Sequence, residues 1–447
     1  MNRKYNRILV ANRGDSAVRV IRACKEMDIE TVSIYSKSDK GTFHTRIADY
    51  SVCIGDVQIK DSYLNAYNVL AVAIAYKVDA IHPGIGFFSE NADFCELCEK
   101  SGIDYIGPGS LNLSLMGNKV RAKNTAKESK IPVISGDAVE IYNYNECLYY
   151  ANKIGYPIIM KATNGGGGKG IRVVEKEEDL LRSLELCLKE TNKVFGSSSV
   201  LIERYVEKSK HIEVQILADK YGNVIHLGDR ECSIQRKNQK LIEETRCTTL
   251  NNDIRQNMYQ GAIQLCKDID YIGVGTVEYI LEPDNSFYFM EMNTRLQVEH
   301  TITELITGID LVKEQIRIAQ GEVLKIKQEE VRFQGYVLQC RILAEYYNGT
   351  FISDFGEITR FDIPGGFGVR VDTSYEVNNS ISTYFDSLLC KICCHDRNKT
   401  LAVSKMLRCL DELRIEGVST NKEILINILK DNRFLSGDYI TTFLDTF

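Results

Sequence analysis

The chain has 447 residues, is 44% hydrophobic and 26% charged, and carries a formal net charge of −6. This length suffices for two or three domains, and the composition is ordinary for a globular protein. Because the sequence has no basic tract, we expect neither nucleic acid nor an anionic membrane as a partner. No apolar run approaches the roughly 20 residues that span a bilayer, and the chain begins without a signal-peptide pattern, so we expect a cytoplasmic protein. Its 14 cysteines are expected to be buried, free thiols.

The first third of the chain alternates strands and helices. Residues 7–35 read as strand, turn, helix and strand. The pattern resumes with a strand at 78–81, a helix at 91–100 and a strand at 104–107. Such alternation predicts a parallel sheet covered on both faces. The loop H-P-G-I-G-F-F-S-E-N (82–91) leaves the carboxyl end of a strand, where open α/β sheets bind ligands.

A second unit contains the glycine-rich run N-G-G-G-G-K-G (164–170). A strand is predicted before it (156–162) and another after it (171–175), whereas a dinucleotide-binding G-x-G-x-x-G must open a helix. The phosphate-loop pattern G-x-x-x-x-G-K-[ST] is also absent. We therefore predict a glycine-rich hairpin whose backbone N–H groups close over phosphates, flanked by Lys161 and Lys169. The alternative is a flexible surface turn.

A polar, charged run, Q-R-K-N-Q-K-L-I-E-E (235–244), contains Lys240, and its charge pattern predicts a solvated face. It follows predicted strands at 199–206, 211–219 and 224–231. The last two of these strands read as a hairpin.

Two extended segments, G-T-V-E-Y-I-L (275–281) and F-Y-F-M-E-M-N (287–293), are joined by a predicted turn at 282–285. A hairpin centred on Asp284 and Asn285 places Glu278 opposite Glu291. Like charges so placed repel each other, and a hard cation such as Mg²⁺ bound by both carboxylates removes the repulsion. The alternative is a surface hairpin whose carboxylates lie in water. Strict alternation adds, on the same face, Phe287, Phe289, Asn293, Arg295, Gln297 and Glu299, and this polar series favours an active site.

The last third of the chain reads as an α+β segment. Strands are predicted at 337–343, 356–361, 367–372 and 387–394, and helices at about 400–413 and 421–430. Arg341 lies within the first of these strands, and a buried arginine normally needs a carboxylate partner. This pattern by itself does not assign Arg341 to catalysis.

Taken together, these stretches resemble the biotin carboxylase family of the ATP-grasp superfamily, nearly from end to end. The motifs that carry the resemblance are A-N-R-G (11–14), H-P-G-x-G-F-x-S-E-N (82–91), L-M-G-x-K (115–119), the glycine-rich 161–170, H-x-E-x-Q (211–215), E-M-N-T-R-L-Q-V-E-H (291–300), C-R-I (340–342), P-G-G-F-G-V-R (364–370) and Y-F-D-S (384–387). The resemblance implies an α/β and α+β protein of three domains. These are a Rossmann-like parallel-sheet domain (1–115), an ATP-grasp domain (116–330) with a mobile glycine-rich lid at about 132–203, and a C-terminal α+β domain (331–447).

The resemblance also implies a reaction and a set of site residues. In this family ATP and bicarbonate give carboxyphosphate and ADP, and the CO₂ released carboxylates N1 of biotin on a carrier protein. Two Mg²⁺ or Mn²⁺ ions are expected to be bound by Glu278, Glu291 and Asn293. The expected ATP contacts are Lys119, Lys161, Gly167, Gly168, Glu203, Arg204, Tyr205, Val206, His211, Asn238, Glu278 and Glu291.

Bicarbonate is expected to be bound by Lys240, Arg295, Gln297 and the backbone of Val298. Glu299 matches the general base, and Arg341 matches the residue that stabilises the biotin enolate. The implied catalytic residues are therefore Glu299, Arg295, Arg341 and Lys240. A carboxylate is a weak base, so the site must raise the pKa of Glu299 or position its side chain closely.

Four departures from the family pattern leave these residues in place. Ile85 replaces the tyrosine of H-P-G-Y-G-F, Asn238 replaces a histidine common in the nucleotide pocket, T-R-C (245–247) stands where E-A-P-A is usual, and D-F-G (354–356) replaces S-P-G. Ile85 lacks a hydroxyl near the biotin side, and Asn238 keeps hydrogen bonding with a different shape.

The biotin attachment sequence A-M-K-M is absent, so biotin is expected on a separate biotin carboxyl carrier protein. Carboxyltransferase subunits and a homodimer are further expectations from the resemblance. The expected setting is an acetyl-CoA carboxylase of fatty acid synthesis, although the sequence leaves the acyl-CoA open. Two alternatives remain: an ATP-grasp ligase acting on another carboxylate, and a nucleotide-binding paralogue without turnover.

Overall fold

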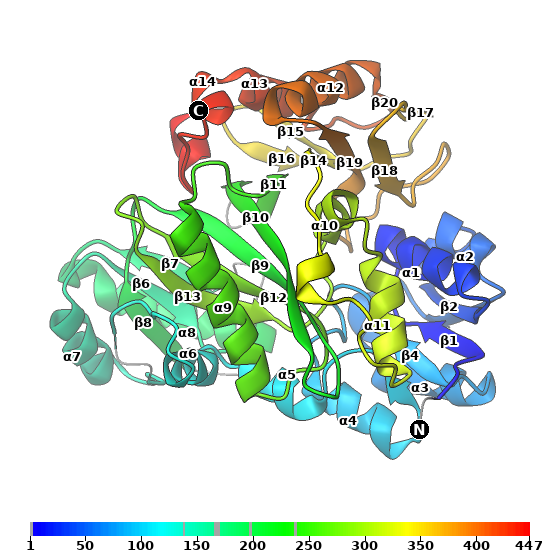
Figure 1. Ribbon diagram of the computed structural model, residues 1–447, viewed down its shortest axis with the longest axis horizontal. Coiled ribbons are helices and arrows are strands. Elements are labelled where there is room, and N and C mark those ends of the chain that lie inside the picture. Colours follow the sequence, from blue (N-terminus) through cyan, green and yellow to red (C-terminus); the bar gives the residue numbers. More distant parts are fainter. Residues whose placement is uncertain (1–2, 137–138, 165–169, 196–198, 237–238) are drawn as a thin grey trace.

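The N-terminal sheet has five parallel strands: β1 (Arg7–Val10), β2 (Glu30–Ser36), β3 (Tyr50–Gly55), β4 (Ala80–His82) and β5 (Asp104–Tyr105). The computed structural model describes residues 3–136, 139–164, 170–195, 199–236 and 239–447. The strands lie in the order β3-β2-β1-β4-β5, at the right of Figure 1. Ile8, Leu9 and Val10 are fully buried, as in a strand covered on both faces. The predicted parallel sheet is confirmed.

Helices surround this sheet and join it to the rest of the molecule. They are α1 (Gly14–Glu26), α2 (Phe43–Ile47), α3 (Ala66–Ala75), α4 (Ala92–Lys100) and α5 (Ser110–Gly117). The buried residues Val20, Ile21 and Cys24 of α1 share one apolar core with Leu311 of α11 (Leu311–Ala319) and with Val274 of the central sheet. This common core fixes the N-terminal sheet against the central part of the chain.

A three-stranded antiparallel sheet in the order β7-β6-β8 lies at the opposite side of the molecule in Figure 1. It consists of β6 (Ile158–Ala162), β7 (Ile171–Val174) and β8 (Val200–Arg204), with α7 (Tyr144–Ile154) and α8 (Leu180–Phe195) against it, and α6 (Lys119–Glu128) leads toward it. β6 pairs antiparallel with β7, so the strand predicted after the glycine-rich run is present. Gly167, Gly168 and Lys169 lie outside the described residues.

The largest sheet has eight strands, and it joins the central and C-terminal parts of the chain. Its order is β13-β12-β9-β10-β11-β14-β19-β18. Its strands are β9 (Lys210–Ala218), β10 (Val224–Arg236), β11 (Gln239–Thr245), β12 (Gly273–Leu281), β13 (Phe287–Asn293), β14 (Tyr336–Leu343), β18 (Val369–Thr373) and β19 (Leu388–Asp396). β11 pairs with β14, so the boundary predicted at residue 330 separates two segments of one hydrogen-bonded sheet. The predicted domain limits stay a prediction.

Helices cover the C-terminal half of this sheet at the top of Figure 1. They are α12 (Lys399–Glu412), α13 (Lys422–Lys430) and α14 (Asn432–Ser436), while α9 (Asn252–Asp268) and α10 (His300–Thr307) pack on the central strands. Two short strand pairs complete the domain: β15 (Glu345–Tyr347) with β16 (Phe351–Ser353), and β17 (Arg360–Asp362) with β20 (Arg414–Glu416). Within the described residues, no helix is long and apolar enough to cross a membrane.

From Lys240 to Glu244 the charged run is not a solvated face, and that part of the prediction is wrong; Gln239 is exposed, and residues 237–238 lie outside the described residues. β11 lies in the interior of the eight-stranded sheet, and Leu241, Glu243 and Glu244 are buried. The carboxylates are tolerated because neighbouring strands and helices supply cations: Arg341 for Glu243 and Lys399 for Glu244. The charged residues of β11 therefore form buried ion pairs and do not face water.

Candidate functional site

The hairpin of β12 and β13 places Glu278 directly opposite Glu291, as predicted. Nearer the turn, Tyr279 pairs with Phe289, which leaves Met290 unpaired as a β-bulge. Neighbouring residues of β12 face opposite sides of the sheet, so Phe289 and Glu291 also face opposite sides. Phe289 is in the apolar core, whereas the side chain of Glu291 is 28% exposed. The prediction that both share one face is wrong because it assumed a strand without a bulge.

The chain stops being extended at Asn293, the last residue of β13. The predicted alternation through Arg295, Gln297 and Glu299 is therefore wrong, because this segment turns and leads into α10. Hydrogen bonds fix its side chains instead. Arg295 donates from Nε to Oε2 of Glu90 (2.8 Å) and from Nη2 to Oδ1 of Asn293 (2.9 Å).

Glu90 comes from the loop 82–91, whose path depends on Asn12. Asn12 Nδ2 donates to the carbonyl oxygens of Pro83 (2.7 Å) and Ile85 (2.9 Å). Gly84 has φ +66°, and a Cβ there would lie 2.7 Å from the Asn12 side chain. Glycine is required at this point, because any other residue would be strained and would clash. The motifs A-N-R-G and H-P-G-x-G-F thus contact each other through Asn12, and the loop they fix positions Glu90 beside Arg295.

Lys240 lies among three carboxylates. Its Nζ is 2.6 Å from Glu299 Oε1, 2.7 Å from Glu213 Oε2 and 3.0 Å from Glu278 Oε1. Burial by itself would lower the pKa of Lys240, but these three carboxylates raise it well above its ordinary value. Lys240 is therefore a permanent cation, and it connects the Glu278–Glu291 pair to Glu299.

Glu299 lies between two cations. Its Oε1 accepts from Lys240, and its Oε2 accepts from Arg341 Nη2 at 3.0 Å. Arg341 also pairs with Glu243, so the carboxylate partner expected for a buried arginine is present. Burial by itself would raise the pKa of Glu299, but attraction by Lys240 and Arg341 lowers it below its ordinary value. Of the two ways to make Glu299 effective, the free site shows close positioning and not a raised pKa.

Two residues to which the sequence analysis assigned no role, Arg230 and Glu213, organise the interior of this cluster. Arg230 is fully buried, and its Nε donates to Glu213 Oε1 at 2.6 Å. Its Nη2 donates to Gln297 Oε1, which leaves Gln297 Nε2 to donate to Glu278 Oε1 at 2.7 Å. For Glu213 the available signal was its place in the motif H-x-E-x-Q (211–215), whereas Arg230 lies among other charged residues of β10 and gave no such signal. Val298 follows Gln297 in the turn before α10.

A second buried ion-pair cluster surrounds Glu203 at the end of β8. Its carboxylate lies 2.7 Å from Lys161 Nζ and 2.8 Å from Lys123 Nζ. Burial by itself would raise the pKa of Glu203, but the two lysines lower it to about 2. Lys123 was not predicted. Lys161 belongs to β6, the strand that precedes the glycine-rich run, so this ion pair lies next to that run in the sequence.

The next three predicted nucleotide contacts follow Glu203 along the chain. Arg204 forms two hydrogen bonds of 3.0 Å with Glu282. Tyr205 N donates to the carbonyl of Pro157 (3.1 Å), and Val206 is buried. These contacts fix the linker that joins the small sheet to β9. Asn238, Gly167 and Gly168 lie outside the described residues.

The carboxylate pair is suited to a divalent cation. Glu278 and Glu291 with Asn293 offer hard oxygen donors on facing strands, the set that Mg²⁺ prefers. Lys119 Nζ lies 3.2 Å from Glu291, Lys240 Nζ lies 3.0 Å from Glu278, and the imidazole Nε2 of His211 lies 3.1 Å from Glu278. The two lysines are cations beside the carboxylate pair, where they can attract negative phosphate groups.

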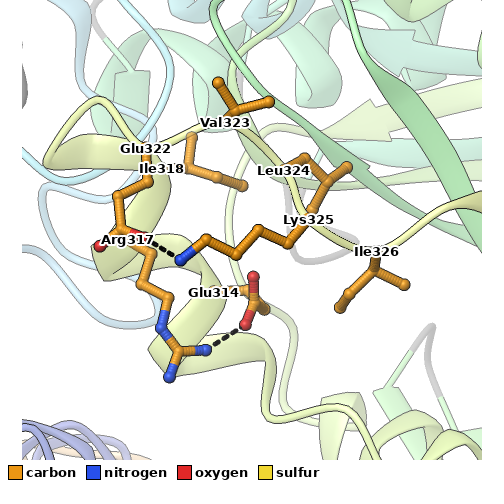
Figure 2. Close-up of a pocket in the computed structure, with 8 residues that line it drawn as sticks. All are labelled: Glu314, Arg317, Ile318, Glu322, Val323, Leu324, Lys325 and Ile326. Atoms are coloured by element: carbon orange, nitrogen blue, oxygen red, sulfur yellow. Dashed lines mark hydrogen bonds and ion pairs between the residues drawn. The ribbon is translucent and has the colours of Figure 1, made fainter.

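A separate cavity of about 280 Å³ lies on α11 and the segment after it (Figure 2). Its charged side chains pair with each other, Arg317 with Glu314 and Lys325 with Glu322 at 2.9 Å. None of its lining residues belongs to the cluster around Lys240. It adds no chemistry to the site.

Comparison with known proteins agrees with this geometry. Family models match along the chain as "Biotin carboxylase, N-terminal domain" (4–113), "Carbamoyl-phosphate synthase L chain, ATP binding domain" (118–327) and "Biotin carboxylase C-terminal domain" (339–446). Biotin carboxylase 1 of Bacillus subtilis is 46% identical over 99% of this chain and 98% of its own length. The 2-oxoglutarate carboxylase small subunit of Hydrogenobacter thermophilus is 44% identical over 99% of this chain and 93% of its own length.

Two crystal structures are similar over almost the whole chain. The biotin carboxylase domain dimer of the Hydrogenobacter thermophilus 2-oxoglutarate carboxylase, in complex with MgADP, ADP and bicarbonate, has a TM-score of 0.97 at 44% identity, covering 99% of this chain and 97% of that one. A Campylobacter jejuni biotin carboxylase in a β,γ-ATP complex also has a TM-score of 0.97, at 39% identity and 99% coverage of both chains. The chain therefore belongs to the biotin carboxylase family of ATP-dependent ligases.

Proposed function

We propose that this chain carboxylates biotin on a separate carrier protein, using ATP and bicarbonate. The observation that carries the proposal is the position of Glu299, held between Lys240 and Arg341 and connected through Lys240 to Glu278. A base for bicarbonate, a cation for its negative charge and a carboxylate for a metal ion thus lie within one hydrogen-bonded cluster. The bicarbonate and MgADP in the Hydrogenobacter structure add support from a relative.

In this proposal Lys240, Arg295, Gln297 and the Val298 backbone bind bicarbonate, and Glu299 removes its proton. The carbonate oxygen then attacks the γ-phosphorus of ATP, so that a new O–P bond forms while the bond to ADP breaks. Bicarbonate brings a negative charge close to Glu299, which raises the pKa of this carboxyl group as the substrate binds. The weak base of the free site thereby becomes stronger when it is needed.

Carboxyphosphate then breaks into CO₂ and phosphate, the phosphate accepts the proton of biotin N1, and N1 forms a bond to CO₂. Arg341 lies on the other side of Glu299, where its fixed charge stabilises the negative charge that develops on biotin. Glu278, Glu291 and Asn293 would hold Mg²⁺, which would neutralise the charge of the phosphates. In this proposal Lys119 and Lys161 contact the same phosphates. The glycine-rich lid predicted to cover them includes residues 165–169, which lie outside the described residues.

The test is ADP release by the purified chain with Mg·ATP, measured with and without bicarbonate and with added biotin. We expect ADP release that requires bicarbonate and that rises with biotin. Nucleotide binding without bicarbonate-dependent ADP, even with a biotinylated carrier, would instead indicate a paralogue without turnover. ADP release that needs a different carboxylate would indicate another ATP-grasp ligase.

We further propose that the acceptor complex is an acetyl-CoA carboxylase. Relatives of similar length that are called simply biotin carboxylase support this choice. A 2-oxo-acid carboxylase is the second candidate, because a 2-oxoglutarate carboxylase subunit and a pyruvate carboxylase subunit are 44% and 43% identical to this chain. Transfer of labelled carbonate to acetyl-CoA, pyruvate or 2-oxoglutarate, with matching carrier and transferase subunits, distinguishes them.

We also propose a homodimer in the cytoplasm. The related Hydrogenobacter structure is a domain dimer. In this chain Phe367, just before β18, is 98% exposed, and we propose it as a contact residue of that dimer. None of the 14 cysteines forms a disulfide, and 13 of them are buried, which suits a reducing compartment.

A further inference from the structure

Lys391 is a buried cation that the proposed reaction does not use. It lies on β19 with only 1% of its surface exposed. In the sheet it stands opposite Arg341 on one side and opposite Asp372 on the other, so the three side chains share one face. A second cation next to Arg341 is unfavourable unless carboxylates compensate for it and its own contacts require it.

Two contacts of Lys391 Nζ explain its place. It lies 2.9 Å from Asp15 Oδ2, in the first turn of α1, and it donates to the carbonyl oxygen of Val298 at 3.1 Å. That carbonyl belongs to the peptide bond between Val298 and Glu299. Glu299 is the residue that caps α10, with φ −84° and ψ 8°. One ammonium group thus joins the C-terminal sheet, the N-terminal domain and the backbone of the predicted base.

We propose that Lys391 is a positioning residue, which holds the Val298–Glu299 peptide so that the Glu299 carboxylate lies between Lys240 and Arg341. The inference rests on the proposed function, because it assigns Lys391 a role in placing the base. Lys240 and Arg341 hold the carboxylate of Glu299, whereas Lys391 contacts the backbone that carries this side chain. Among the described side chains, Lys391 is the only one recorded as donating to the Val298 carbonyl.

The competing explanation is that Lys391 only braces two domains through Asp15. The two roles separate, because Asp15→Asn weakens the brace and leaves the Lys391–Val298 hydrogen bond, whereas Lys391→Met removes both. Lys405 supplies a matched control. It lies in the same domain and likewise contacts a backbone carbonyl and an aspartate, His395 O (2.6 Å) and Asp396 (2.8 Å), away from the site.

The experiment measures bicarbonate-dependent ADP release and Mg·ATP binding by calorimetry for the full chain and these variants. For Lys391→Met we expect kcat to fall on the order of 10- to 100-fold, as for a reacting group displaced by about 1 Å. The Kd for Mg·ATP should stay within about twofold, because Lys119 and Lys161 lie elsewhere. Lys391→Arg, which keeps the charge and donors, should recover part of kcat. Asp15→Asn and Lys405→Met should stay within about threefold of the wild type, about 0.7 kcal/mol.

Three results would overturn the inference. They are a Lys391→Met enzyme with unchanged kcat, an Asp15→Asn enzyme as impaired as Lys391→Met, and equal losses of kcat and Mg·ATP affinity. Lys391→Met leaves the Asp15 carboxylate without its partner, which could prevent folding. In that case the double variant Lys391→Met/Asp15→Asn, which removes this carboxylate as well, is used, and its kcat is compared with that of Asp15→Asn. Failure of both to fold would make Lys391 a folding residue and reject a positioning role. If the wild type shows no bicarbonate-dependent ADP release, the proposed function fails instead.

Discussion

Replacing Glu299 with glutamine tests the assignment of the base with the smallest change in shape. The variant loses the negative charge but keeps the side-chain length and one acceptor oxygen for Lys240 or Arg341. Loss of a general base costs about 10²- to 10⁴-fold in rate. This corresponds to about 3 to 5 kcal/mol of transition-state stabilisation. We therefore expect kcat for bicarbonate-dependent ADP release to fall by at least about 100-fold.

The structure predicts that this loss occurs without unfolding. Four carboxylates, Glu213, Glu243, Glu278 and Glu299, surround the three cations Lys240, Arg230 and Arg341. After the substitution three carboxylates remain for three cations, so no buried cation is left without an anionic partner. Thermal unfolding should change little, and Mg·ATP should bind with nearly unchanged affinity.

A matched control separates loss of a base from loss of a buried carboxylate. Glu304 lies on the same helix, α10, and pairs with Arg19 and Arg370 at 2.7 Å each. Glu304→Gln leaves these two arginines without a shared anion, so it should lower the unfolding temperature and retain kcat. A Glu299→Gln enzyme that keeps a third or more of the wild-type kcat would refute the assignment of Glu299.

The pH dependence gives a second check on Glu299. Its pKa lies below the ordinary 4.5, because Lys240 and Arg341 outweigh the effect of burial. The free enzyme therefore carries the anion at every pH above about 4.5, and the base is lost only as pH falls below that value. We expect no inflection from Glu299 in kcat/KM for bicarbonate between pH 5 and 8. An inflection there that disappears in Glu299→Gln would contradict this reasoning.

Three further substitutions test the surroundings of the site. Glu203→Gln should lower the free energy of unfolding at pH 7 by about 3 kcal/mol, because the pKa of Glu203 is about 2 in the folded protein and 4.5 in the unfolded chain. This contribution is present above pH 4.5 and is lost as pH falls toward 2. An unchanged unfolding temperature would contradict it. Glu278→Gln should raise the Mg²⁺ concentration for half-maximal ADP release by on the order of 10-fold or more, and chelation of Mg²⁺ should abolish turnover; equal Mg²⁺ dependence would remove Glu278 from the metal site. Phe367→Glu should shift sedimentation from dimer to monomer, whereas an unchanged dimer would place the interface elsewhere.

Local patterns were sufficient where the signal depends on near neighbours in the chain. The parallel sheet could be predicted because apolar strands alternate with amphipathic helices, and the pairing of Glu278 with Glu291 followed from the length of one hairpin. The strand after the glycine-rich run was predictable for the same reason. The bulge at Met290 could not be predicted, because the sequence of the two strands does not show which residue stays unpaired.

Burial of charge was the main feature that local patterns could not predict. The run containing Lys240 has the composition of a solvated face, and only its place between β10 and β14 makes it interior. Its compensating charges come from residues far away in the sequence, such as Glu213 and Glu299. A sequence shows which residues are charged, but it does not show which of them share a low-dielectric environment.

The sequence by itself determined the class of fold, the family and the candidates for metal, phosphate and bicarbonate contacts, because these depend on ordered short motifs. The tertiary structure decided how the candidates meet. It placed Glu299 between two cations with a lowered pKa, Arg230 behind Gln297, and Lys391 beneath the Val298–Glu299 peptide. The contacts of Lys391 join β19 to α1 and to the turn before α10. Both of its partners, Asp15 and Val298, are more than 90 residues away from it in the sequence. Long-range packing brings such groups together, and only their mutual distances set the charge, orientation and proton affinity of the base.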